Sequence, residues 1–148
     1  MMQHNDDIGT KEDLAGYRLQ TAKSNLNAAR ILLEAKEYKS ANNRAYYAIF
    51  QAINAIHALS GKAYKRHGEA IGSFNKDYVK TEIFPRDIGR KIAQAEEIRH
   101  ASDYDDFYIA SHEEAQRLVT NAEEFIQLTE AYLAAQVENS GNVPRTRE

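Results

Sequence analysis

The spacing of apolar residues near the N-terminus constrains the fold of this chain more than any other feature. From Ala15 to Leu33, apolar side chains recur at alternating intervals of four and three residues. Side chains at this spacing share one face of an α-helix. The stripe consists of Ala15, Leu19, Ala22, Leu26, Ala29 and Leu33. Thr10, three residues before Asp13, predicts the N-cap of this helix.

A second helix is predicted from about Tyr38 to Ser60, and its apolar surface is broader than one stripe. Two neighbouring rows follow helical spacing: Ala45, Ile49, Ala52, Ile56 and Leu59 in one, and Tyr46, Phe50 and Ile53 in the other. So wide an apolar surface is typical of a central helix, or of one that also meets a second subunit. Gly61 follows this segment, where glycine commonly ends a helix.

Spacing and capping signals predict three further helices. A basic, glycine-flanked loop at residues 61–69 precedes a shorter helix with apolar positions 71, 74, 78 and 79. Pro85 separates that helix from a fourth one, and Ser111 with Glu114 forms a capping-box pattern that opens the last. The inward-facing residues of the fourth and last helices are Ile88, Ile92, Ala95, Ile98, Ala115, Leu118, Ala122, Phe125 and Tyr132.

Length and composition fit one helical domain. The chain has 148 residues, with only 2 Pro and 7 Gly to interrupt helices, and a chain of this length builds one core. We therefore expect an all-α, single-domain, up-and-down bundle of about five helices. Residues 11–138 form the predicted domain, preceded by a disordered segment at 1–10 and followed by a flexible polar tail at 139–148.

Residue types exclude several chemistries. The chain contains no cysteine, which rules out disulfides and cysteine-based zinc sites. His100 has Asp103 three residues later, but one such pair is too weak to predict a metal, and no metal or cofactor is expected. No apolar run approaches the length of a membrane span, and the N-terminal residues lack a signal-peptide pattern. We expect a cytoplasmic protein that makes no membrane contact.

Charge is unevenly distributed along the chain, although the net charge is only −3. Residues 62–99 carry nine Lys or Arg against six acids, whereas residues 102–138 carry nine acids against one arginine. A solvent-exposed acidic helix face explains the second segment, and a surface for a basic partner is the alternative. The basic stripe of a protein that binds duplex DNA is missing.

Two clusters of arginine and tyrosine lie within the core-forming helices. Arg44 and Tyr47 belong to the second helix, and Arg99, Asp103 and Tyr104 belong to the fourth. An arginine beside tyrosines can bind phosphate through its planar guanidinium while a base stacks on the aromatic face. It can equally hold two helices together: Arg99 and Asp103 have ion-pair spacing, and Arg44 can hydrogen-bond to Asp103 or Tyr104 across the bundle. Both interpretations stay open.

Several short motifs follow one another in a specific order. They are Asn43-Arg44-Ala45-Tyr46-Tyr47-Ala48-Ile49-Phe50; Lys65-Arg66-His67-Gly68 before Ile71-Gly72-Ser73-Phe74-Asn75; Tyr78-Val79-Lys80-Thr81; Arg99 with Asp103-Tyr104; and Glu113-Glu114-Ala115 leading into Ala122-Glu123-Glu124-Phe125. In this order the chain resembles the HEPN domain family over roughly residues 11–136. It is most similar to the small stand-alone branch that is often encoded beside a minimal nucleotidyltransferase.

The resemblance implies a homodimeric bundle, commonly one half of a toxin–antitoxin-like system with a minimal nucleotidyltransferase as its partner. Active members of the family are metal-independent ribonucleases whose signature is an arginine, four to six residues, and a histidine. In that chemistry the histidine exchanges a proton near neutral pH, and the arginine stabilises charge on the phosphate. Here the three positions open to the histidine after Arg99 hold Tyr104, Asp105 and Asp106.

Two functional hypotheses follow. In the first, the chain is a homodimeric HEPN module that binds a nucleotidyltransferase partner and nucleotide or RNA. In the second, it is a ribonuclease toxin with an altered site, in which Arg99 stabilises phosphate and Tyr104 or a nearby histidine carries the proton. A tyrosine pKa of about 10 makes a poor base at neutral pH.

The candidate residues follow from these hypotheses. The catalytic candidates are Arg99 and Tyr104. The nucleotide- or RNA-binding candidates are Arg44, Tyr47, Lys65, Arg66, His67, Arg99 and Asp103. His67 also fits a helix-start or loop position, and Lys65 and Arg66 fit a solvated surface that could guide RNA electrostatically.

Overall fold

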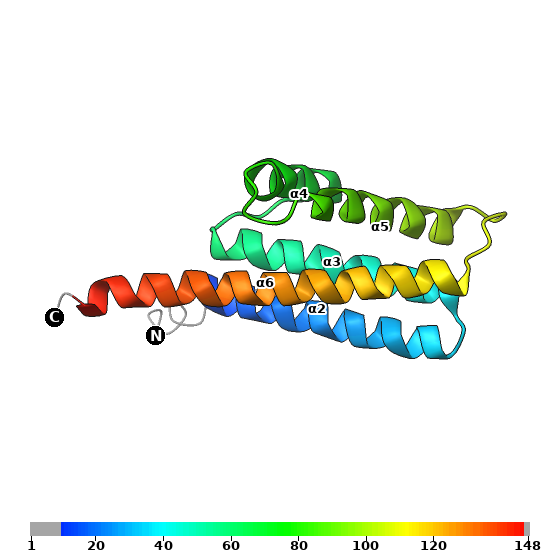
Figure 1. Ribbon diagram of the computed structural model, residues 1–148, viewed down its shortest axis with the longest axis horizontal. Helices are drawn as coiled ribbons and strands as arrows, with labels where there is room; N and C mark the ends of the chain where they lie inside the picture. The colour runs from blue at the N-terminus through cyan, green and yellow to red at the C-terminus, as the bar shows by residue number, and fades with distance from the viewer. Residues whose placement is uncertain (1–9, 147–148) are drawn as a thin grey trace.

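Four long helices run side by side along the molecule, each opposite in direction to the one before (Figure 1). The computed structural model describes residues 10–146, and in this range the long helices are α2 (Lys11–Glu34), α3 (Tyr38–Leu59), α5 (Asp87–Tyr104) and α6 (His112–Thr146). The short helix α4 (His67–Phe74) and the π-helical segment η1 (Asn75–Val79) link α3 to α5. No strand occurs in the described range. The predicted all-α bundle of about five helices is confirmed.

Helix α3 is at the centre of the bundle. It packs against α2, α4, α5 and α6, and its buried side chains include Ala45, Ile49, Ile53 and Ile56. Burying one large aliphatic side chain contributes about 1.5–3 kcal/mol, so this helix supplies much of the core. Its broad apolar surface is covered by helices of the same chain, as expected for a central helix.

Helix ends follow the local signals in the sequence. Thr10 is the N-cap of α2, and its Oγ1 accepts a hydrogen bond from the backbone N–H of Asp13 at 3.0 Å. Gly61 has a φ of 78°, a left-handed conformation that glycine adopts at little cost just after a helix. The predicted stripe of α2 faces inward, with four members buried and Leu19 and Leu33 packed against the core.

The start of α6 shows only half of the predicted capping box. Ser111 Oγ accepts a hydrogen bond from the backbone N–H of Glu114 at 3.1 Å. The Glu114 carboxylate does not return to Ser111; it accepts a hydrogen bond from the hydroxyl of Tyr108. The side chain of Glu114 therefore ties the α5–α6 loop to the first turn of α6.

Helix α6 is longer than expected. It continues to Thr146, past residue 138, where the domain was predicted to end, and its last turns extend beyond the other helices (Figure 1). Gly141 and Pro144 are both unfavourable in a helix, but neither ends α6 before Thr146. Of the predicted disordered segment, residues 1–9 lie outside the described residues, as do 147–148 of the predicted tail. No helix in the described part of the chain is both long and apolar enough to cross a membrane.

Candidate functional site

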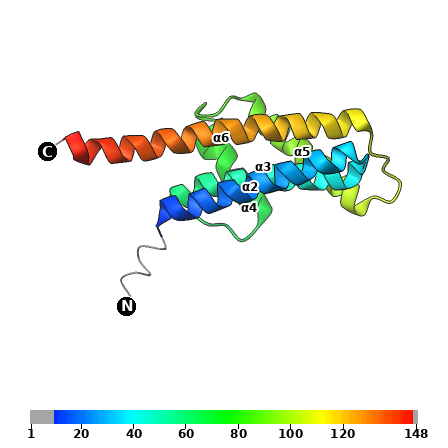
Figure 2. The ribbon, with the colours of Figure 1, turned by 90° about the horizontal axis from the view of Figure 1, so that it is seen from below.

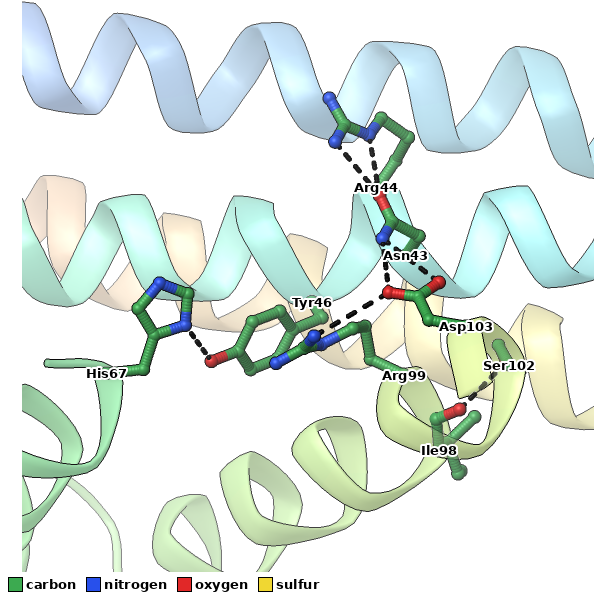
Figure 3. Close-up of polar contacts among 8 residues, drawn as sticks. All are labelled: Asn43, Arg44, Tyr46, His67, Ile98, Arg99, Ser102 and Asp103. Carbon is green, nitrogen blue, oxygen red and sulfur yellow. Dashed lines mark hydrogen bonds and ion pairs between the residues drawn. The ribbon is translucent and has the colours of Figure 1, made fainter. Parts of the chain in front are cut away.

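The guanidinium of Arg99, from α5, lies on the ring of Tyr46 of α3 (Figure 3) and also near Tyr47 of the same helix. Its Cζ atom is 4.6 Å from the ring centroid of Tyr46 and 5.7 Å from that of Tyr47. The side chain is only 14% exposed. Burial acts to lower the pKa of Arg99, but Tyr46, Tyr47 and Asp103 outweigh it and raise that pKa. A permanent positive charge is thus held on an aromatic surface, and its buried Nε has no hydrogen-bond partner.

Asn43 connects this arginine to a second one. Arg99 Nη1 is 3.6 Å from Asp103 Oδ2, and Asn43 Nδ2 donates to both oxygens of Asp103, at 3.3 and 3.0 Å. Asn43 Oδ1 accepts from Nε and Nη2 of Arg44, at 3.1 and 2.9 Å. The direct hydrogen bond from Arg44 to Asp103 or Tyr104, which was one of the two interpretations left open, does not form; the partners of Arg44 are Asn43 and Asn25. In the register of α3 it is Asn43 that faces α5, while Arg44 turns toward α2 (Figure 3).

Arg44 is held by neutral groups. Besides Asn43, its partner is Asn25 of α2, whose Oδ1 accepts from Nη1 at 2.9 Å, and its Cζ atom lies 5.4 Å from the ring centroid of Tyr47. No carboxylate among the described residues forms an ion pair with Arg44. Amide oxygens orient the guanidinium without neutralising its charge, which leaves it suited to an anion.

An open pocket lies beside this network. Its lining residues belong to the end of the bundle where α2 turns into α3 and α5 leads into α6, an end that Figures 1 and 2 show. Buried hydrogen bonds fix its base: Asn42 Nδ2 donates to Ser102 Oγ at 3.2 Å, and Ser102 donates to the carbonyl of Ile98 at 2.7 Å. The lining residues are Leu32, Lys39, Ser40, Asn43, Arg44, Ser102 and Asp103.

His67 reaches the same tyrosine as Arg99. It is the first residue of α4, as the helix-start interpretation expected, and its Nδ1 is 2.9 Å from the hydroxyl oxygen of Tyr46. Its ring stacks on Phe50 with centroids 3.9 Å apart. Burial, and then the charge of Arg99, lower the pKa of His67, so its imidazole is neutral at neutral pH. Burial, and then Glu96, raise the pKa of Tyr46 to about 12.

The other candidates lie apart from this cluster. The side chain of Tyr104 is 68% exposed, and its ring packs on His100 with centroids 5.0 Å apart. Five residues after Arg99 on an α-helix, Tyr104 points about 140° away from it. Lys65 and Arg66 are exposed in the loop before α4. The structure therefore groups Arg99 with His67 and not with Tyr104.

Sequence reasoning left out three residues of the site. Asn43, Asn25 and Tyr46 were not among the candidates, although they position Arg44, Asp103, Arg99 and His67. For Asn43 a signal existed, since an amide beside an arginine in a core-forming helix needs a partner once buried. For Asn25 the partner belongs to another helix, and no local pattern identifies it.

Comparison with known proteins identifies the class to which this helical bundle belongs. The model of the HEPN domain matches residues 15–132. The chain therefore belongs to the HEPN domain family.

Two relatives and one solved structure show how far the similarity extends. The chain is 28% identical over 123 residues to "UPF0332 protein" of Thermotoga maritima, covering 83% of this chain and 93% of the relative. It is 33% identical over 108 residues to "Putative toxin MJ0605" of Methanocaldococcus jannaschii, covering 73% and 80%. The crystal structure of TT1696 from Thermus thermophilus is similar with a TM-score of 0.67 at 20% identity, over 79% of this chain and 96% of that one. That last likeness concerns the fold alone.

Proposed function

We propose that this HEPN protein is a homodimeric module of a toxin–antitoxin-like two-component system, in which it binds a nucleotidyltransferase partner and holds a nucleotide or RNA strand at the Arg44–Arg99 site. Similarity to a protein named as a toxin supports the class of system. The observation that carries the ligand is Arg44, whose guanidinium is oriented by two amide oxygens and paired with no described carboxylate.

The two arginines have different parts in this proposal. Arg44 borders the open pocket and offers a fixed planar cation to a phosphate group. Tyr47, which lies beneath Arg44 and Arg99, offers a stacking face to a base. Asp103 is held by Asn43 and can accept a hydrogen bond from a ribose hydroxyl. An anion that binds here can also draw Arg99 from its long 3.6 Å contact with Asp103.

Fluorescence anisotropy with labelled single-stranded RNA and labelled nucleotide tests this site. Losing one charge-assisted hydrogen bond costs about 1.5–3 kcal/mol, so Arg44→Gln and Arg99→Gln are each expected to weaken binding about 10- to 100-fold. The control is Arg117→Gln, an exposed arginine of α6, which is expected to bind like wild type. Equal affinities for all four proteins would contradict the proposed site.

The assembly needs separate measurements. Light scattering of the purified chain is expected to give twice the monomer mass of 16.8 kDa, and a monomer would contradict the dimer. The partner is tested by co-expression with a nucleotidyltransferase encoded by a neighbouring gene, with co-elution as the expected result. Two separate peaks at micromolar concentration would contradict that pairing.

A metal-independent ribonuclease is the second candidate function, and the position of His67 favours it. His67 and Arg99 approach Tyr46 from different helices, so a neutral imidazole and a guanidinium border one surface. In phosphodiester cleavage an imidazole can exchange a proton and a guanidinium can stabilise charge on the phosphate, although here the two groups come from α4 and α5 instead of one helix.

RNA cleavage in EDTA distinguishes the two functions. If the chain is a ribonuclease, cleavage is lost in both His67→Ala and Arg99→Ala and kept in His100→Ala, whose side chain is exposed on α5. Far-UV circular dichroism must show equal helicity in all variants. If wild type does not cleave a mixed pool of single-stranded and structured RNAs, the ribonuclease is refuted and binding remains.

A further inference from the structure

The loop between α5 and α6 carries the most exposed large apolar side chains in the described part of the chain. Phe107 is 92% exposed and Ile109 is 87% exposed. The loop projects past the neighbouring helix ends at its end of the bundle (Figures 1 and 2). Covering these side chains with an apolar surface removes them from water, which is favourable, so the loop is suited to anchor a protein contact.

Hydrogen bonds hold the loop in one shape. Asp105 Oδ1 accepts from the backbone N–H of Phe107 at 3.0 Å, and the carbonyl of Asp105 accepts from the backbone N–H of Tyr108 at 3.1 Å. The hydroxyl of Tyr108 donates to the Glu114 carboxylate, and Tyr108 packs against the core. Its neighbours Phe107 and Ile109 are left outside. A loop that is already fixed loses little conformational entropy on binding, which favours affinity.

The surroundings of the two apolar side chains are acidic. Residues 102–115 contain five Asp or Glu and no Lys or Arg. Asp105, Asp106 and Glu113 are exposed, and none of them forms an ion pair with another described residue. A protein that covers the two apolar side chains must therefore present cations beside its own apolar pocket, because complementary charges favour association.

We propose that residues 105–109 form a docking loop for the nucleotidyltransferase partner. Phe107 and Ile109 occupy an apolar pocket of that protein, and lysine or arginine side chains at the rim of the pocket face Asp106. This inference rests on the proposed function, since the partner is the one proposed there. It adds the surface through which the partner binds and the chemistry that the partner must offer.

Two other occupants fit the docking loop less well. RNA would bring its phosphate groups against carboxylates, whereas protein surfaces that bind nucleic acid offer cations to the phosphates. A second copy of the chain that paired loop to loop about a two-fold axis would place the acids of one loop against the same acids of the other. Like charges in contact oppose association. A partner with a basic rim meets neither difficulty.

Isothermal titration calorimetry with the nucleotidyltransferase encoded by a neighbouring gene tests the docking loop. Phe107→Ala and Ile109→Ala are each expected to raise the Kd at least about tenfold, as truncation of an interface anchor does. Asp106→Lys should also raise the Kd and make it less sensitive to salt, because it removes an attraction that salt screens. The matched control is Ile31→Ala on α2, where the isoleucine is 60% exposed; this variant should bind like wild type.

Two further measurements separate the docking loop from the ligand site and from the homodimer. Phe107→Ala and Ile109→Ala should bind labelled single-stranded RNA with the wild-type affinity in fluorescence anisotropy. They should also keep the wild-type mass in light scattering. Both side chains are exposed, and surface substitutions rarely unfold a protein, so circular dichroism should match wild type.

Each contrary result refutes a stated part of the account. If wild type binds the nucleotidyltransferase and the loop variants bind it equally well, the docking loop is overturned and the partner of the proposed function stands. If wild type does not bind it, that partner fails and the docking loop fails with it. A loss of RNA affinity in Phe107→Ala would assign the loop to the ligand surface, and a changed mass would assign it to a contact between copies. Either of these two results would overturn the docking loop.

Discussion

Replacing Tyr46 separates the two roles that its side chain has at the site. The residue is fully buried; its hydroxyl is 2.9 Å from His67 Nδ1, and its ring supports Arg99 and stacks on Phe50 with centroids 6.1 Å apart. Tyr46→Phe removes only the hydroxyl and keeps the ring. Tyr46→Ala removes both and leaves a cavity between α3, α4 and α5.

The structure sets a different magnitude for each change. One net hydrogen bond contributes about 0.5–1.5 kcal/mol, so Tyr46→Phe is expected to lower the free energy of unfolding by that amount. Truncating a buried aromatic side chain to alanine costs about 3–5 kcal/mol, and a desolvated cation–π contact contributes up to about 2 kcal/mol. Tyr46→Ala should therefore lose at least twice as much stability as Tyr46→Phe.

Urea unfolding followed by far-UV circular dichroism measures both losses. The dependence of the free energy on urea should stay the same, since neither variant changes the surface exposed on unfolding by much. A loss below about 1 kcal/mol for Tyr46→Ala would refute the claim that the tyrosine ring is a packed support for Arg99. Equal losses for the two variants would refute the separation of ring from hydroxyl.

Three further predictions concern stability. Burial lowers the pKa of His57 from 6.5, and its Nε2 donates to the carbonyl of Ala70 at 2.9 Å. The unfolded chain therefore takes up a proton below about pH 6.5 that the folded chain resists, so the free energy of unfolding decreases as the pH is lowered through this range. Unfolding titrations of His57→Gln should show a smaller decrease. Thr10→Ala should lose about 0.5–2 kcal/mol in urea unfolding by removing the cap of α2, whereas Thr10→Ser should keep most of it. Gly61→Ala should lower the free energy of unfolding by about 1–2 kcal/mol in the same assay, because a Cβ atom is sterically unfavourable in a left-handed conformation. That atom would also lie 3.0 Å from Lys11 Cε. A stability equal to wild type would contradict this prediction.

Local patterns were sufficient to predict most of the fold. The α2 cap at Thr10, the end of α3 before Gly61 and the inward stripes all follow from neighbouring residues. The end of α6 could not be read in the same way, because Gly141 and Pro144 weaken a helix without deciding where it ends. The hydrogen bond from the Tyr108 hydroxyl to the Glu114 carboxylate could not be predicted either, since Tyr108 belongs to the preceding loop.

The site was less predictable, because its geometry depends on helix rotation. The sequence predicted two clusters of arginine and tyrosine whose side chains could meet across the bundle. The structure brings Arg44, Arg99 and Asp103 together through Asn43, whereas Tyr104 is exposed. Which residue of α3 faces α5 depends on the rotation of that helix in the bundle, and the result is that Asn43 lies between Arg44 and Asp103. His67 is far from Arg99 in sequence, and only the packing of α4 on α3 places it at Tyr46.

The salt dependence of RNA binding tests the central claim most directly, because it counts the phosphates that protein cations contact. For single-stranded nucleic acid, the slope of log K against log salt concentration is about −0.7 for each neutralised phosphate. We predict that Arg44→Gln and Arg99→Gln each reduce the magnitude of the wild-type slope by about 0.7 per site, while Arg117→Gln leaves it unchanged. A slope that stays the same in Arg44→Gln and Arg99→Gln would show that neither arginine contacts phosphate, and would contradict the account.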